Sequence, residues 1–217
     1  MRDHERMSDD PTHVREFFGA RAAGWDSRFP DDGPAYAAAV EELDLRPGDA
    51  VLDAGCGTGR ALPPLRAAVG PTGTVLGVDL TPEMLEEAVK AGRGGRNDVS
   101  GRAGHEGTAT LLLADVGRLP VRDGALDAVF GAGLVSHLAD PVADLRELAR
   151  VVRPGGRLAL FHPIGRAALA ARHGRRITPD DLRAEPRLRP VLAEAGWRLV
   201  SYVDEDTRYL ATAVREA

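Results

Sequence analysis

Residues 51–59 read Val51-Leu52-Asp53-Ala54-Gly55-Cys56-Gly57-Thr58-Gly59, an apolar run that leads into a stretch with three glycines. The run from Ala50 to Ala54 predicts a short buried strand, and Arg60 to Val69 predicts a helix despite its two prolines. Glycines between a strand and a helix let a ligand approach backbone N–H groups at the positive end of the helix. The stretch therefore indicates a nucleotide-type binding loop, although small residues also form ordinary tight turns.

Two aspartates follow later predicted strands. Asp79 ends the strand Thr74 to Asp79, about twenty residues after the glycines, where a carboxylate can accept hydrogen bonds from both ribose hydroxyls. Asp115 follows the strand Thr108 to Leu113, where a carboxylate can accept from an adenine amino group. Either aspartate alone is at least as typical of a solvated strand end. Three such features in order, each at the carboxyl end of a strand, favour the ligand-binding interpretation.

The rest of the chain alternates strands with helices. Two short helices precede the core, the second from Ala35 to Leu43, and Gly92 to Gly107 is predicted to be a mobile surface loop. Strands alternating with helices predict a mostly parallel sheet covered on both faces, with an antiparallel strand near its end. The remaining predicted elements are strands at Leu126 to Gly131, Arg157 to His162, Trp197 to Val203 and Tyr209 to Val214, and helices at Thr81 to Ala91 and Pro141 to Val152.

Composition restricts the class of protein. A chain of 217 residues fits one domain, because a domain typically has roughly 100–200 residues. The net charge of −5 disfavours a dedicated nucleic-acid binder. Cys56 is the only cysteine, the segment Met1 to Pro11 lacks the apolar stretch of a secretory signal, and no apolar run is long enough to cross a bilayer. We therefore expect a cytoplasmic protein without a membrane association, a monomer or a homodimer.

The ordered motifs resemble the class I S-adenosylmethionine-dependent methyltransferases. The resemblance is strong from Val51 to Ile164. It implies a Rossmann-like α/β fold with a seven-stranded sheet of order 3-2-1-4-5-7-6, in which strand 7 is antiparallel. It also implies an N-terminal helical cover over residues 1–44, a core domain over 45–217 and an acceptor-side insertion over 165–195. Besides residues 51–59, the matching segments are Gly77-Val78-Asp79-Leu80-Thr81-Pro82-Glu83-Met84-Leu85, Ala114-Asp115, Leu119-Pro120, Leu126-Asp127-Ala128-Val129, Leu145-Arg146-Glu147 and Arg153-Pro154-Gly155-Gly156.

The same resemblance implies a set of residues for S-adenosylmethionine and its product S-adenosylhomocysteine. The methionine part of the cofactor is expected beside Asp53, the loop glycines and the Gly131 carbonyl. The ribose is expected at Asp79. The adenine is expected among Leu80, Met84, Asp115 and the Val116 backbone. Arg21 is expected near the methionine carboxylate. Trp25 is either beside the sulfonium, where an aromatic face attracts a cation, or a plain core residue. Cys56 is expected to be a small packing residue of the loop. The cofactor set is Arg21, Trp25, Asp53, Gly55, Gly57, Gly59, Asp79, Leu80, Met84, Asp115, Val116 and Gly131.

Two histidines are candidate general bases for a hydroxyl acceptor. His137 and His162 follow predicted strands at the cofactor edge, whereas the other four histidines lie in regions expected to be exposed. For His137 a structural role is as typical as catalysis. No acidic cluster after the fourth predicted strand indicates a metal, and Phe130-Gly131-Ala132-Gly133 stands where amino-group nucleic-acid methylases carry an Asn/Asp-Pro-Pro-aromatic motif. A small-molecule O-, N- or C-acceptor is therefore the leading class.

Three alternatives remain open. The segment from Arg166 to Arg189 holds seven arginines, which fits a solvated helical face, an anionic acceptor or, less well, RNA. An NAD-dependent oxidoreductase also uses a glycine loop and a following acid, but its third glycine would fall at Arg60. A non-catalytic S-adenosylmethionine-binding protein would keep the same loop and acids.

Overall fold

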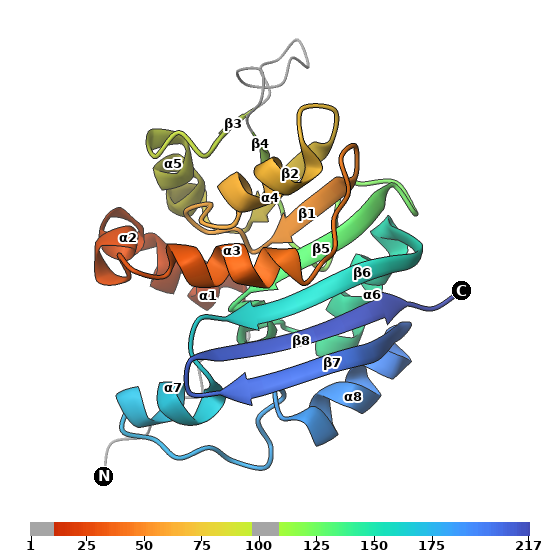
Figure 1. The fold of residues 1–217 in the computed structure, drawn as a ribbon. Helices are drawn as coiled ribbons and strands as arrows, with labels where there is room; N and C mark the ends of the chain where they lie inside the picture. Colours follow the sequence, from red (N-terminus) through yellow and green to blue (C-terminus); the bar gives the residue numbers. More distant parts are fainter. Residues whose placement is uncertain (1–10, 97–108) are drawn as a thin grey trace.

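The structure is a computed structural model that describes residues 11–96 and 109–217. Its centre is an eight-stranded sheet of order β3-β4-β2-β1-β5-β6-β8-β7, in which β8 is antiparallel to both neighbours and the other pairs are parallel (Figure 1). The strands are β1 (Ala50–Ala54), β2 (Thr74–Asp79), β3 (Gly94–Arg96), β4 (Ala109–Leu113), β5 (Leu126–Ala132), β6 (Val152–His162), β7 (Trp197–Glu205) and β8 (Arg208–Arg215).

The predicted fold class and the order of its seven strands are confirmed, but the number of strands is wrong. The eighth strand, β3, lies beside β4 within the stretch that the sequence predicts to be a mobile loop. A Cβ atom on Gly94 would lie 2.8 Å from Cγ of Leu111, so this edge strand can approach β4 only because glycine has no side chain. Most of the remaining predicted loop lies outside the described residues, as do His4 and His105.

Helices cover both faces of the sheet (Figure 1). On one face α3, α4 and α5 pack against Val51, Phe130 and Phe161. On the other face α6 and α8 pack against Leu52, Val129 and Trp197. The Trp197 indole donates a hydrogen bond to the Leu145 carbonyl at 2.8 Å, which ties β7 to α6. The helices are α1 (Pro11–Gly19), α2 (Trp25–Arg28), α3 (Gly33–Glu41), α4 (Leu62–Val69), α5 (Pro82–Lys90), α6 (Pro141–Val151), α7 (Arg166–Arg172) and α8 (Glu185–Glu194), with 3-10 turns η1 (Ala22–Gly24) and η2 (Leu134–His137).

Two predicted boundaries differ from those observed. β6 begins at Val152, five residues before the predicted start at Arg157, so the segment Pro154-Gly155-Gly156 lies within the strand. The pairing of β5 with β6 shifts register between Leu126 and Ala128, and this irregularity accommodates the proline and glycines. The turn between β7 and β8 is shorter than predicted, because the strands extend to Glu205 and from Arg208.

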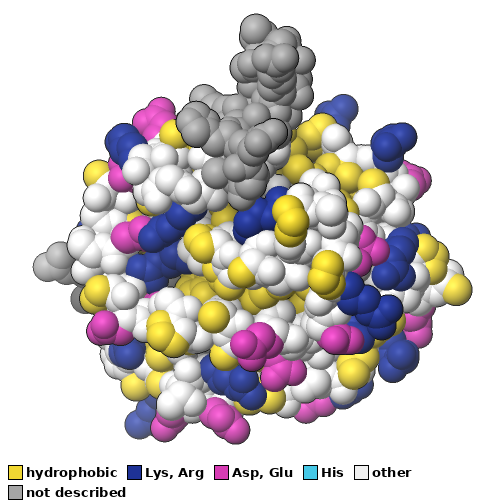
Figure 2. All heavy atoms as spheres, turned by 45° about the horizontal axis from the view of Figure 1, so that its top comes forward, with side chains coloured by type: hydrophobic (Ala, Val, Ile, Leu, Met, Phe, Trp, Pro, Cys, Tyr) yellow, Lys and Arg dark blue, Asp and Glu magenta, His cyan; other side chains and the backbone are white. Residues whose placement is uncertain are grey.

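No described helix has the length and apolar character needed to cross a membrane. On the face shown in Figure 2, basic and acidic side chains are interspersed, and neither sign forms a continuous stripe across the visible atoms. Such mixing differs from the clustered positive surface that is typical of proteins that bind a nucleic-acid backbone.

Candidate active site

The glycine loop connects β1 to α4. Gly55, Gly57 and Gly59 have φ angles of 68°, 53° and 80°, in the left-handed region that side chains disfavour. A Cβ atom on Gly59 would also lie 2.8 Å from Cδ1 of Leu62. Two N–H groups of the loop donate hydrogen bonds within the protein. That of Cys56 donates to the Val78 carbonyl and that of Gly59 to the Cys56 carbonyl, both at 2.8 Å. It is a tightly folded turn that only glycine can form.

Two carboxylates lie at the ends of β1 and β2 beside this loop. Asp79 accepts hydrogen bonds from the N–H groups of Gly57 and Thr81, both at 2.8 Å, which fastens the end of β2 to the loop. Asp53 is only 1% exposed. Its burial, together with the charge of Asp79, raises the pKa of Asp53 to about 8, and burial also raises the pKa of Asp79. The site therefore holds two acids that a cationic or hydroxyl-bearing ligand would satisfy.

The expected adenine-side residues lie around the next strand end. Met84 is buried, and its sulfur would lie 4.0 Å from a Cβ atom on Gly57. Leu80 and Val116 are half-buried, and Asp115 is exposed. The Asp115 carboxylate accepts the Gly117 N–H at 2.9 Å. The structure thus brings Asp79, Met84 and the loop together and leaves Asp115 open at the rim.

Leu134 packs at the candidate site, although the sequence does not single it out. A Cβ atom on Gly131 would lie 2.9 Å from Cδ2 of Leu134, and one on Gly55 would lie 3.3 Å from Cδ1 of Leu134. Leu134 therefore packs between the glycine loop and the end of β5. The only sequence signal for this contact is that Leu134 follows Gly133, whose φ of 67° turns the chain back over the sheet.

An aromatic row joins the N-terminal elements to η2. The ring of Phe29 lies 5.4 Å from Trp25, Trp25 lies 5.4 Å from Phe18, and Phe18 lies 5.0 Å from His137, all between ring centroids. The Phe18 ring therefore lies directly against His137. Arg21 donates to the Phe17 carbonyl at 2.8 Å and stacks over the Phe17 ring at 3.7 Å, so its guanidinium lies on α1.

Asp26 joins these N-terminal elements to the glycine loop. Its carboxylate accepts hydrogen bonds from Thr58 Oγ1 at 2.6 Å, Arg60 Nε at 3.1 Å and Arg93 Nη1 at 2.5 Å. Burial alone would raise the pKa of Asp26, but these three donors lower it. Arg60 also pairs with Asp32 at 3.3 Å. The sequence places Trp25 and Asp26 in one motif but gives no sign of these partners, the farthest of which is 67 positions away.

His162 lies at the end of β6 and is the better defined of the two histidines. Its Nδ1 lies 2.8 Å from the Ile164 carbonyl oxygen. Burial lowers the pKa of His162, and the charges of Arg183 and Arg172 lower it further, so the ring is neutral at neutral pH. The Ile164 N–H also lies 3.2 Å from Nδ1. In the tautomer with the proton on Nδ1, this nitrogen donates to the Ile164 carbonyl and Nε2 keeps a lone pair. His137 lies at the end of η2 against Phe18.

Four of the seven arginines between residues 166 and 189 have acidic partners. Arg166 pairs with Asp204 at 2.8 Å and Asp181 at 3.7 Å, and Arg183 pairs with Asp181 at 3.0 Å. Arg187 and Arg189 pair with Asp180 and Glu185. In the described part of the chain no ion pair is formed by Arg172, Arg175 and Arg176, which are exposed.

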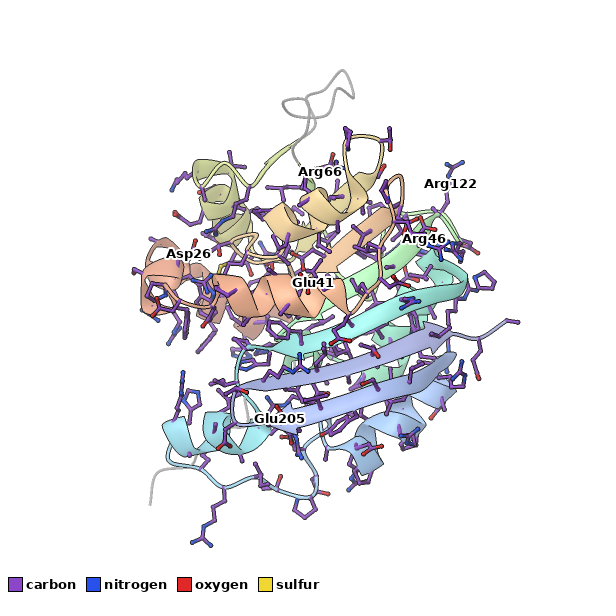
Figure 3. The ribbon with its side chains drawn as sticks, in the orientation of Figure 1. Asp26, Glu41, Arg46, Arg66, Arg122 and Glu205 are labelled. Atoms are coloured by element: carbon purple, nitrogen blue, oxygen red, sulfur yellow. The ribbon has the colours of Figure 1, made fainter. Side chains whose placement is uncertain are left out.

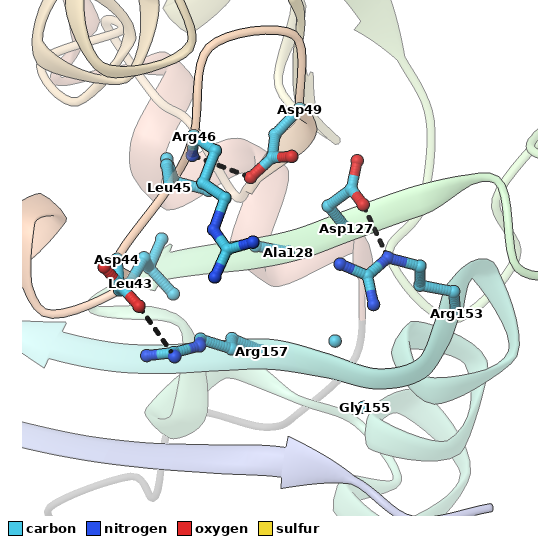
Figure 4. A pocket seen from close by; sticks show the side chains of 11 residues that line it. Leu43, Asp44, Leu45, Arg46, Asp49, Asp127, Ala128, Arg153, Gly155 and Arg157 are labelled. Carbon is cyan, nitrogen blue, oxygen red and sulfur yellow. Dashed lines mark hydrogen bonds and ion pairs between the residues drawn. The ribbon is translucent and has the colours of Figure 1, made fainter.

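A separate hollow lies at the opposite end of the sheet, with a cavity volume of about 290 Å³. Arg153 pairs there with Asp127 at 2.6 Å and Arg157 with Asp44 at 2.9 Å, while the Arg46 side chain extends between them (Figure 4). Figure 3 places Arg46 near Arg122, at the far end of the molecule from Asp26 and Glu205. The hollow therefore lies at the amino ends of the strands, away from the carboxylates of β1 and β2.

Known proteins are similar to this chain in sequence. The family model described as Methyltransferase domain matches residues 52–160. An arsenite methyltransferase from Halobacterium salinarum is 29% identical over 183 residues, which is 77% of this chain and 42% of the relative. A 27-O-demethylrifamycin SV methyltransferase from Amycolatopsis mediterranei is 36% identical over 118 residues, 54% of this chain and 40% of the relative. This chain spans between 33% and 50% of the length of the curated relatives it matches.

A solved structure shows the same fold. The crystal structure of a SAM dependent methyltransferase from Aquifex aeolicus superposes with a TM-score of 0.64 at 24% identity, covering 95% of this chain and 97% of that one. The matched family model spans half of the chain and includes the glycine loop, Asp79, Asp115 and most of β6. The chain therefore belongs to the methyltransferase-domain family, the class I S-adenosylmethionine-dependent methyltransferases.

Proposed function

We propose that this chain transfers the methyl group of S-adenosylmethionine to a small-molecule acceptor. The observation that carries the proposal is a pair of carboxylates, the buried Asp53 and the half-buried Asp79, beside a glycine loop. This set fits the cofactor, because one acid can meet a cationic amino group and the other can accept from ribose hydroxyls. The exposed Asp115 carboxylate is available for the adenine amino group. The names of the curated relatives, which include arsenite and demethylrifamycin SV, support a small acceptor.

The loop geometry argues against the oxidoreductase alternative. A dinucleotide site needs free N–H groups at the start of a helix to hold the pyrophosphate. Here the N–H groups of Cys56, Gly57 and Gly59 all donate hydrogen bonds to acceptors within the protein. The position that would carry the third glycine is Arg60, whose guanidinium is held by Asp26 and Asp32. The loop thus has no phosphate cradle at these three positions.

Calorimetric titration with S-adenosylmethionine, S-adenosylhomocysteine and NAD tests the cofactor. We expect binding of the first two and none of NAD, because the site offers carboxylates in place of anion-binding N–H groups. Binding of NAD alone would refute the proposal. Tight binding of S-adenosylhomocysteine without methyl transfer to any acceptor would favour the non-catalytic alternative.

The residues around His162 suit an acceptor that loses a proton. When bound, S-adenosylmethionine supplies a sulfonium methyl group that is already activated for displacement. The acceptor's lone pair forms a bond to the methyl carbon while the carbon–sulfur bond breaks and its electron pair stays on sulfur. We assign His162 Nε2 to receive the acceptor's proton, because the ring is neutral and Nδ1 is fixed by Ile164.

The two histidines are distinguished by substitution. A His162→Ala variant should lose about 10²-fold or more in kcat, the usual contribution of a general base, with unchanged affinity for S-adenosylhomocysteine. His137→Ala should weaken packing against Phe18 and change kcat less. The assay is transfer of a radiolabelled methyl group to a metabolite extract, followed by mass spectrometry of the labelled product. Near-normal turnover by both variants would show that positioning alone suffices.

A further inference from the structure

Tyr209 carries a buried hydroxyl that the proposed function does not use. The residue is 1% exposed, and within the described ranges its hydroxyl has no hydrogen-bond partner. Buried polar atoms are nearly always paired, because an unpaired one forfeits its bonds to water without compensation. The adjacent Tyr202, whose ring is 5.8 Å away, follows this rule, since its hydroxyl donates to the Arg183 carbonyl at 2.9 Å. Tyr209 is the exception that needs an explanation.

The pairing of the strands places Tyr209 beside the predicted base, His162. Tyr209 is the direct antiparallel partner of His162 on β6 and of Asp204 on β7. Directly opposed residues of an antiparallel pair share one face, with Cβ atoms about 4.5–5.5 Å apart. His162, Tyr209 and Asp204 therefore form one row across three strands, at the edge of the sheet where β6 ends.

Arginine side chains surround this row. Arg166 and Arg183 lie close enough to act electrostatically on Tyr209, as does Asp181. Asp181 and Asp204 are both bound to arginines, so they are not open acceptors. Arg172, which acts on His162, forms no ion pair within the described ranges. Burial raises the pKa of Tyr209, so its hydroxyl remains a donor. The row therefore offers the Tyr209 hydroxyl as a donor, and Arg172 is the one nearby arginine without an ion pair in the described ranges.

We propose that the Tyr209 hydroxyl is a donor of the acceptor subsite and that it takes an anionic oxygen, a carboxylate or a phenolate, of a small molecule. This inference rests on the proposed methyl transfer and adds the acceptor's charge and its anchoring residue. An oxyanion gives the orphan hydroxyl an acceptor, the charge of Arg172 favours an anion in this region, and the hydrogen bond holds the acceptor molecule near His162. A nucleic-acid backbone suits the site less, because a hydroxyl buried between β6, β7 and β8 admits only a small group.

The experiment compares Tyr209→Phe with its neighbour Tyr202→Phe. Each variant removes one hydroxyl, but only that of Tyr202 has a partner in the protein. Radiolabelled methyl transfer is measured on a metabolite extract divided by anion exchange at mildly alkaline pH, and thermal unfolding and S-adenosylhomocysteine affinity are measured for all proteins. We expect label in the retained, anionic fraction. Tyr209→Phe should raise KM for that acceptor by about tenfold or more, the factor for a lost hydrogen bond to a charged group.

The other measurements separate binding from folding. Tyr209→Phe should unfold at the wild-type temperature or above and bind S-adenosylhomocysteine normally, whereas Tyr202→Phe should unfold at a lower temperature. The inference is overturned by label confined to the unretained fraction or to ribonuclease-sensitive polymer, by an unchanged KM, or by a clear loss of stability in Tyr209→Phe. Absence of label from every fraction is a different failure, because it refutes the methyl transfer on which the inference rests.

Discussion

Replacing Asp26 by alanine tests whether the N-terminal elements and the glycine loop behave as one unit. The change removes three bonds, from Thr58 at 2.6 Å, Arg60 at 3.1 Å and Arg93 at 2.5 Å. The Asp26 side chain is 37% exposed, so each arginine pair contributes only about 0.5 kcal/mol. The bond from the buried Thr58 hydroxyl to a carboxylate contributes about 1.5 kcal/mol. The loss totals about 2.5 kcal/mol in the free energy of unfolding.

Thermal unfolding and calorimetry measure the outcome. A loss of that size lowers Tm by about 5–10 °C in a chain of this length. S-adenosylhomocysteine should also bind more weakly, because Thr58 lies between Gly57 and Gly59 of the loop. Asp31→Ala is the matched control, an exposed acid of the same segment, and should change neither quantity. A normal Tm for Asp26→Ala refutes the energetic estimate, and a lower Tm with unchanged affinity refutes the link to the loop.

Two further substitutions test the cofactor edge. Because the pKa of Asp53 is raised to about 8, the folded chain keeps a proton that the unfolded chain loses near pH ~3.9, so this residue lowers stability as pH rises through that window. Asp53→Asn should therefore have a higher Tm than wild type, and this difference should grow as the pH rises from ~3.9 to about 8. A difference that does not change with pH would contradict the raised pKa. Gly59→Ala should cost about 1–2 kcal/mol for its left-handed φ, plus the clash with Leu62. Gly33→Ala, where a Cβ atom meets nothing, should unfold like wild type.

The parts of the site that were predictable are those encoded by local order. The strand with its three glycines and the acids at the ends of later strands are local patterns of a few residues each. The structure brings Asp53, Asp79 and Met84 together around the loop. The contacts of Asp26 were not predictable, because Arg60 and Arg93 reach it only after the sheet has formed. Similarly, Tyr209 becomes a neighbour of His162 through strand register, which alternation alone does not specify. β3 was missed because two glycines are typical of a loop.

The partners of Asp26 also bear on the order in which the chain is made. Asp26 leaves the ribosome before its partners, because its ion pairs are with residues 34 and 67 positions later. Asp26 thus waits for its partners until residues up to Arg93 have been synthesised. Both carboxylates and the glycine turn are therefore synthesised before Arg93 completes the set of bonds that hold Asp26, whereas Thr58 and Arg60 are available to Asp26 earlier.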